Sequence, residues 1–138
     1  MEEYDNEVIR ELRNDPRQRL TEIARKLSIS RQSAMRSLKR VEGYVVKYTT
    51  IPDFRALGFE VYAVMLFHPK SRRLLSFLKK SQNINSLAVS SGQFAVIATA
   101  IFRNMKSYSE FEDRAAELCT SKRTHFIVEE VKQEDAGC

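Results

Sequence analysis

The sequence predicts an α+β fold in two parts, because helical and strand patterns occupy separate stretches of the chain. Before residue 43, apolar residues recur at helical spacing in three short segments. After Gly58, runs such as VYAVMLF and FAVIATAIF, typical of strands, are interspersed with two further helical patterns. The order β-α-β-β-α-β in this second part is that of a ferredoxin-like domain.

The first part has the helix-capping and helix-breaking residues expected of a helix-turn-helix. A first helix is predicted over about residues 5–14, and the following NDPR ends it because proline cannot continue the helical hydrogen bonds. Thr21 is expected to cap a second helix, and Ser30 to cap a third that runs to about residue 41. The β-branched and aromatic YVVKYTTI (44–51) then predicts a small β wing. The first part is therefore expected to be a winged helix-turn-helix domain.

The second part is expected to contain four strands and two helices. One helix follows Pro69, and Ser107 is expected to cap the other. The expected strands cover residues 61–67, 85–91, 94–102 and 124–131. We divide the chain into a winged helix-turn-helix domain (1–50), a linker (51–59), a ferredoxin-like domain (60–132) and a tail (133–138).

The strands 61–67 and 94–102 hardly alternate between apolar and polar residues. A ferredoxin-like sheet carries both helices on one face, so continuous apolar strands indicate that the other face is also covered. The same sheet of a second subunit would cover it face to face. We therefore expect a homodimer.

Composition excludes several classes of protein. The chain is 43% apolar, and its longest largely apolar run, nine residues from Phe94 to Phe102 with one threonine, is far shorter than the ~20 residues that span a bilayer. The acidic N-terminus is neither a signal nor a transit peptide, so we expect a cytoplasmic protein with no membrane partner. Two histidines and no Cys-x-x-Cys pair argue against a metal or other cofactor. Cys119 and Cys138 leave a disulfide or redox switch open, although cytosolic thiols are normally reduced.

Positive charge is concentrated in one segment. Residues 16–47 hold nine Lys/Arg and two acids, a net charge of +7, whereas the remainder of the chain has a net charge of −2. This asymmetry indicates an anionic partner for that segment.

On a helical wheel, the third predicted helix has one apolar and one cationic side. Gln32, Arg36 and Lys39 point away from its apolar residues. Lys and Arg neutralise phosphates, and Arg and Gln can each hold a base edge through two hydrogen bonds. A solvated cationic surface is the alternative, but the three-residue turn, the absence of acids between Glu22 and Glu42, and the following wing favour double-stranded DNA. The predicted DNA contacts are Thr21, Ser30, Arg31, Gln32, Ser33, Arg36, Lys39 and Arg40.

These features, in order, resemble the Lrp/AsnC regulators. The resemblance covers about residues 4–132: an aspartate opening the first helix, NDPR, IARKLSIS, a basic helix ending in LKRVE, a valine-rich strand, and FRALGFE as the linker. It implies a sequence-specific DNA-binding dimer that regulates transcription and often assembles into higher oligomers such as octamers. Many members of the family also bind an amino acid between effector domains.

Two positions depart from the family pattern. Ser28 stands in the turn where the family usually has glycine, so a left-handed backbone there would cost stability. The effector loop reads SSGQFAV, and no acid follows Gly92 until Glu110, where the family has an aspartate close behind the glycine. The predicted effector contacts are therefore Ser91, Gly92 and Gln93, without a partner for an ammonium group. Sensing of an amino acid is doubtful on this ground.

Two rival functions belong to other classes. Some haem-pathway decarboxylases are similar in architecture, but His68 and His125 are the only histidines, and no nucleophile with a base is evident. A module that binds only protein would leave the +7 segment unexplained. We therefore predict a regulator rather than an enzyme.

Overall fold

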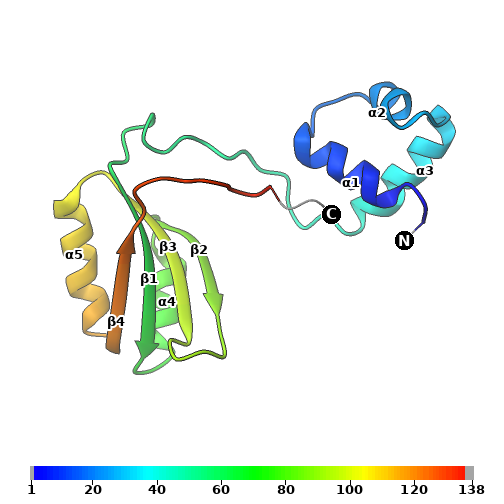
Figure 1. The fold of residues 1–138 in the computed structure, drawn as a ribbon. Helices are drawn as coiled ribbons and strands as arrows, with labels where there is room; N and C mark the ends of the chain where they lie inside the picture. Colours follow the sequence, from blue (N-terminus) through cyan, green and yellow to red (C-terminus); the bar gives the residue numbers. More distant parts are fainter. Residues whose placement is uncertain (1, 136–138) are drawn as a thin grey trace. The chain divides into compact units, whose positions relative to one another are not determined.

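The computed structural model describes residues 2–135, and it confirms the predicted α+β fold class (Figure 1). The chain forms two compact units, which are described separately. The first contains residues up to Ile51 together with the described residues after Val131, and the second is Pro52–Val131.

Three helices make up the first unit: α1 (Asp5–Asn14), α2 (Leu20–Leu27) and α3 (Arg31–Glu42). Their apolar stripes meet in a small core of Val8, Ile23 and Val41, each at most 1% exposed. The bounds agree with the sequence pattern, except at the start of α2.

Thr21 does not cap α2, contrary to our prediction. The N-cap is Arg19, and the backbone N–H of Ile23 donates to its carbonyl at 3.2 Å. The helix starts earlier than expected because Leu20 is half-buried and joins the first turn. Thr21 therefore lies inside that turn, with its side chain exposed.

The turn between α2 and α3 has a left-handed residue, as the sequence indicated. Ser28 has φ 53° and ψ 42°. Its N–H donates to the Arg25 carbonyl at 3.2 Å, and the Ile29 N–H donates to the Ala24 carbonyl at 3.0 Å. This is the double hydrogen bond of a Schellman motif, in which glycine is the usual left-handed residue.

Replacing Ser28 by glycine should stabilise the first unit by about 1 kcal/mol, because glycine adopts this conformation without a steric penalty. In a small domain this corresponds to a rise in melting temperature of roughly 4–8 °C. Ser33→Gly is the control, since Ser33 is right-handed within α3 and glycine there should destabilise the protein. A melting temperature unchanged by Ser28→Gly would contradict the view that the left-handed conformation of Ser28 is strained.

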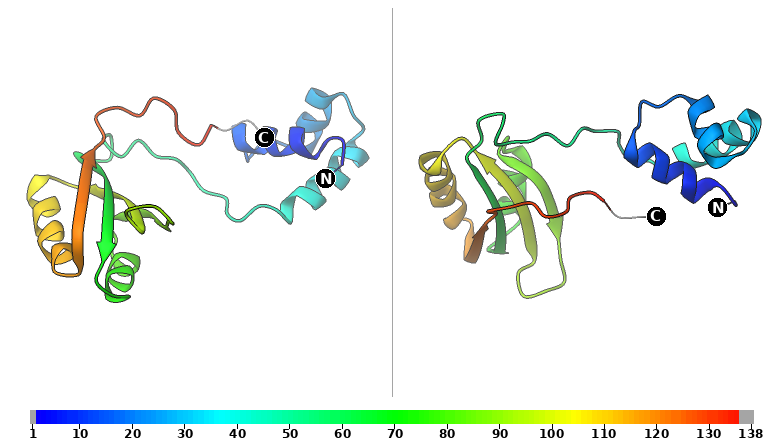
Figure 2. Two further views of the ribbon diagram at one scale, coloured as in Figure 1. Left: turned by 60° about the horizontal axis from the view of Figure 1, so that its bottom comes forward. Right: turned by 45° about the horizontal axis from the view of Figure 1, so that its top comes forward.

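The second unit is a four-stranded antiparallel sheet of order β2-β3-β1-β4 with two helices on one face (Figures 1 and 2). Its core includes Met65, Phe67, Leu74, Phe102 and Phe111, all at most 2% exposed. The elements are β1 (Val61–Pro69), α4 (Arg73–Lys80), β2 (Ile84–Val89), β3 (Val96–Phe102), α5 (Met105–Ala116) and β4 (Cys119–Phe126).

The fourth strand was predicted too late in the sequence. It was expected at 124–131, but β4 begins at Cys119, and its inward residues include Lys122 and Thr124. These polar side chains are satisfied from α5, where Glu112 pairs with Lys122 and the Tyr108 hydroxyl lies 3.1 Å from Thr124 Oγ1. The apolar alternation that marks a strand is therefore absent from β4.

The cap of α5 also differs from the prediction. Asn104, not Ser107, is the N-cap, and its side-chain oxygen accepts a hydrogen bond from the Ser107 N–H at 2.9 Å. Ser107 therefore donates its backbone N–H to the cap, whereas its hydroxyl was expected to be the capping acceptor.

The wing strand expected over residues 44–51 is not formed. The N–H groups of Tyr44 and Val45 donate back to the end of α3, and no ladder follows. Val46 is fully exposed and Tyr48 is 56% exposed. A strand needs a neighbour with which to share its hydrogen bonds, and no strand in residues 2–135 pairs with this segment.

Burial along β1 alternates strictly between the two faces of the sheet. The side chains facing the helices are buried, and those between them, including Tyr62, Val64 and Leu66, are half-buried. Across the sheet, Leu66 lies opposite Ile97, so this second face carries a stripe of apolar side chains. We call it the open face.

Candidate nucleic-acid interface

Helix α3 presents a polar and cationic surface on the side away from the core. Ala34, Ser37 and Val41 are buried, while Gln32, Arg36 and Lys39 are exposed. The predicted cap is confirmed, because Ser30 Oγ accepts the Ser33 N–H at 3.0 Å. The first turn has no acidic residue, so the positive end of the helix dipole is not neutralised locally.

Internal pairing separates the six cations between Ala24 and Arg40 into two groups. Lys26 Nζ lies 3.0 Å from the Glu11 carboxylate, and Arg40 pairs with Asp5. The four others, Arg25, Arg31, Arg36 and Lys39, are exposed and make no ion pair within residues 2–135. They remain available to phosphates or base edges.

Arg40 was predicted to contact DNA, and the structure places it elsewhere. Its Nη2 lies 3.0 Å from Asp5 Oδ1, its Nε lies 3.2 Å from Oδ2, and Glu2 is a second anionic partner at 3.3 Å. The guanidinium is held at the junction of α1 and α3. Its charge therefore balances a carboxylate instead of extending the outward surface.

Asp5 is a fully buried carboxylate that the sequence did not reveal as such. The Ser37 hydroxyl donates to its Oδ1 at 2.5 Å, and the Glu2 N–H donates to Oδ2 at 2.9 Å. Hydrogen bonds from Arg40 foremost, then from Ser37 and the Glu2 backbone, hold the pKa of Asp5 well below its ordinary value. This network fixes α3 against α1 and thereby orients the outward residues.

The stability of the first unit should depend on Asp5 in acid. Because the pKa of Asp5 is lower in the folded than in the unfolded protein, its contribution is fully present above the ordinary value of about 3.9 and is lost as the pH falls below it. Melting temperatures between pH 6 and 3 should therefore fall less steeply for Asp5→Asn than for wild type, from a lower value at pH 6. Parallel pH profiles would contradict this role.

Two exposed residues on or beside the α3 surface are absent from the predicted DNA contacts. Met35 is 38% exposed and lies one turn from Lys39 on the outward side, where its apolar side chain suits a thymine methyl group. Arg25, at the end of α2, is exposed beside the turn. A helical wheel that sorts residues only by polarity counts methionine as a core residue, so it cannot identify Met35 as an exposed contact.

The predicted effector residues Ser91, Gly92 and Gln93 are all exposed in the loop between β2 and β3. Ser90 organises this loop, since its hydroxyl donates to the Phe94 carbonyl at 2.6 Å. The loop lies at the end of the sheet where Val89 pairs with Val96. It presents no acidic side chain of its own.

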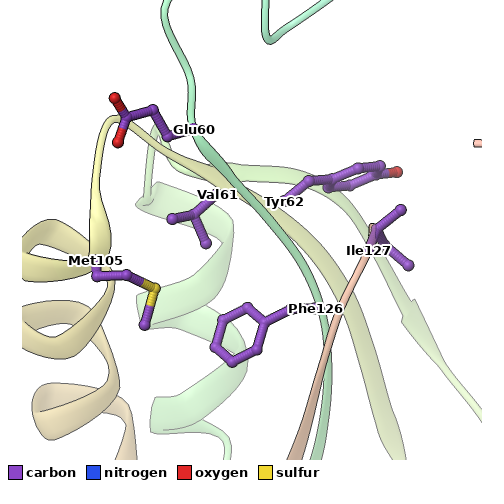
Figure 3. Close-up of a pocket in the computed structure, with 6 residues that line it drawn as sticks. All are labelled: Glu60, Val61, Tyr62, Met105, Phe126 and Ile127. Carbon is purple, nitrogen blue, oxygen red and sulfur yellow. The ribbon is translucent and has the colours of Figure 1, made fainter. Parts of the chain in front are cut away.

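A small pocket of about 240 Å³ lies at the other end of the sheet. Val61, Met105 and Phe126 turn toward one another there, whereas Tyr62 and Ile127 extend to the other face of β1 (Figure 3). Burial, and then the nearby Glu130 carboxylate, raise the pKa of the Tyr62 hydroxyl. Glu60 is the sole ionisable group besides Tyr62 in this lining, which therefore lacks the convergent polar groups of a catalytic site.

Residues 2–135 contain no cluster of three or more potential metal ligands, and no helix among them is long and apolar enough to cross a membrane. The Cys119 thiol is buried and free, and burial raises its pKa. Cys138 lies outside the described residues.

Comparisons with known proteins agree with this geometry. A family profile described as winged helix-turn-helix DNA-binding matches residues 1–42. The uncharacterised HTH-type transcriptional regulator PH0045 of Pyrococcus horikoshii is 28% identical over 119 residues, which cover 80% of this chain and 77% of that protein. The leucine-responsive regulatory protein of Rhizobium meliloti is 24% identical, with coverage of 96% and 92%.

Solved structures share the whole fold. Bacillus subtilis LrpC has a TM-score of 0.87 at 21% identity, with coverage of 96% of this chain and 97% of that one. A Neisseria meningitidis transcriptional regulator, NMB0573, solved as a complex with L-Met, has a TM-score of 0.85 at 17% identity, with coverage of 96% and 93%. Both sequence relatives are named as regulators and neither as an enzyme, which agrees with a regulator rather than with the decarboxylase alternative.

Proposed function

We propose that this chain, as a member of the Lrp/AsnC family of DNA-binding transcriptional regulators, reads its DNA sites as a homodimer through α3. The observation that carries the proposal is the outward surface of α3, where Gln32, Arg36 and Lys39 are exposed and the two cations have no acidic partner in the described chain. Arg36 and Gln32 are suited to base edges, and Lys39 to a phosphate. With DNA as its target, the protein would act in the cytoplasm.

The flanking residues have supporting roles in this proposal. Arg31, Ser30 and Ser33 lie at the N-terminus of α3, where free N–H groups and the helix dipole favour a phosphate. Thr21 is exposed near the start of α2 and would contact the backbone. Arg40 is left out, because it is engaged with Asp5.

Two features, one in each unit, support a homodimer. The open face carries half-buried Tyr62, Val64, Leu66 and Ile97, an apolar stripe that a second copy of the sheet would cover. The exposed segment 44–51 has unpaired backbone groups and strong β propensity, so it would gain a neighbour in an assembly. Higher oligomers would use surfaces that remain free in the dimer.

The direct test is binding of the purified protein to labelled duplex DNA as a function of salt. Phosphate neutralisation releases counterions, so log affinity should fall linearly with log salt concentration, by roughly 0.9 per phosphate contacted. The double variant Arg36→Ala with Lys39→Ala should show a shallower slope and weaker binding. Wild-type protein that is not retained by any duplex at low salt would overturn the proposal.

We also propose that the SSGQFAV loop does not bind a free amino acid. A carboxylate could meet backbone N–H groups near Gly92, but the ammonium group would find only neutral acceptors such as Gln93. We expect none of the twenty amino acids, at millimolar concentration, to raise the melting temperature by mass action. A saturable rise with one of them, abolished by Gly92→Val, would contradict this and align the protein with NMB0573, which was solved with L-Met.

A further inference from the structure

The ferredoxin-like unit has a basic surface of its own. Between Glu60 and Glu110 the sequence has seven Lys/Arg and no acid. Most of these cations gather on α4 and the turn before it. Lys70, Arg72, Arg73, Lys79 and Lys80 are all exposed there.

None of these five side chains makes an ion pair within the described residues. No salt bridge within residues 2–135 includes a residue of α4 or its cap, and Lys70 reaches only the Glu117 carbonyl, at 3.3 Å. The acids of the unit lie mainly on α5 and beyond, and Glu112 on α5 is paired with Lys122 of β4. No ion pair within the described residues therefore balances the positive charge of α4.

Two arginines lie at the N-terminus of α4, the end at which the helix dipole disfavours positive charge. Arg72 is the N-cap of α4 and Arg73 its first residue, yet the first turn has no acid and no side-chain cap. Cations at a helix N-terminus oppose the helix dipole, whereas Lys79 and Lys80 at the C-terminus suit it. No acidic side chain in the described chain offsets this cost, so the two guanidinium groups remain available to an external anion.

We propose that the exposed cations of α4 form a second DNA-contacting surface, which binds the phosphate backbone without reading bases. The inference rests on the proposed function, since it assigns these cations to the same duplex that α3 reads. Arg72 and Lys79 are seven residues apart and so lie on one line along α4, as do Arg73 and Lys80. Two parallel lines of cations on a helical surface match a polyanion by charge and carry no sequence preference.

The test uses the full chain on a duplex that contains the preferred site with long flanks. The variant is Arg72→Gln with Lys79→Gln, and the control is Lys106→Gln with Arg114→Gln, which removes the same charge from exposed positions of α5. The α4 variant should bind several-fold more weakly, and its slope of log affinity against log salt should flatten by roughly 1 to 2. Its preference among sequences should not change, and the control should behave as wild type.

Three results would overturn the proposal. Wild-type protein that binds no duplex overturns the proposed function and this inference with it. Wild-type binding together with an unchanged salt slope in the α4 variant overturns this inference alone. A change in the mass of the DNA-free α4 variant, with unaltered DNA affinity, would instead identify α4 as a contact with another protein subunit.

Discussion

Replacing Arg36 by alanine should weaken binding to the preferred DNA site by about 1–3 kcal/mol and relax the preference at one base position. Arg36 is exposed at the centre of the α3 surface and has no ion pair in the described chain, so its guanidinium is free to hold a guanine edge through two hydrogen bonds. Because it has no internal partner, the substitution should change stability by less than about 0.5 kcal/mol. Affinity for the preferred and for single-base variant duplexes, measured by fluorescence anisotropy, checks both effects.

Lys39→Ala and Lys106→Ala are the matched controls for Arg36. Lys39 lies on the same surface but is assigned to a phosphate, so its loss should weaken all sequences alike. Lys106 is an exposed cation of α5 outside the surface, and its loss should change nothing measurable. If Arg36→Ala kept both the affinity and the ratio between sequences, the assigned orientation of α3 would be wrong.

Replacing Ile97 by aspartate should separate the subunits of the proposed dimer while leaving each chain folded. Ile97 is half-buried on the open face, opposite Leu66 on β1 and Ala88 on β2. In the single chain the new carboxylate would reach water, but between two sheets it would be buried unpaired, which costs several kcal/mol. Sedimentation should show the mass of one chain, and circular dichroism should show an intact fold.

Two further aspartate substitutions serve as controls that distinguish dissociation of the dimer from unfolding of the chain. Val89 is 69% exposed at the end of β2, so Val89→Asp should leave the dimer unchanged. Ala98 is 1% exposed and faces the helices, so Ala98→Asp should unfold the second unit rather than dissociate it. An Ile97→Asp protein with the wild-type mass would contradict face-to-face packing.

Local signals were enough to predict most elements, including α3. Ser30 was identified as the cap of α3 because capping depends on residues within one turn. Asn104 was missed as the cap of α5 because Ser107, three residues later, is an equally good capping type. Such errors move a boundary without changing the fold.

The larger misses depend on partners distant in sequence. The role of Arg40 is decided by Asp5, 35 residues earlier, and no helical wheel of α3 contains that residue. Strand β4 escaped notice because α5 supplies polar partners to Lys122 and Thr124, which removes the apolar alternation. The segment 44–51 has the composition of a strand, but composition cannot supply the neighbour that a strand requires.

Selection of bound sequences from random duplex DNA by the purified wild-type protein tests sequence-specific DNA binding most directly. We predict an enriched motif with two-fold symmetry and half-sites about 10–10.5 base pairs apart, or a multiple of that spacing, because a symmetric dimer presents two copies of α3 to one side of the duplex. Repeating the selection with Arg36→Ala should alter the same base in both half-sites. If the wild-type protein bound DNA but enriched no common motif, the claim of sequence-specific binding would be contradicted.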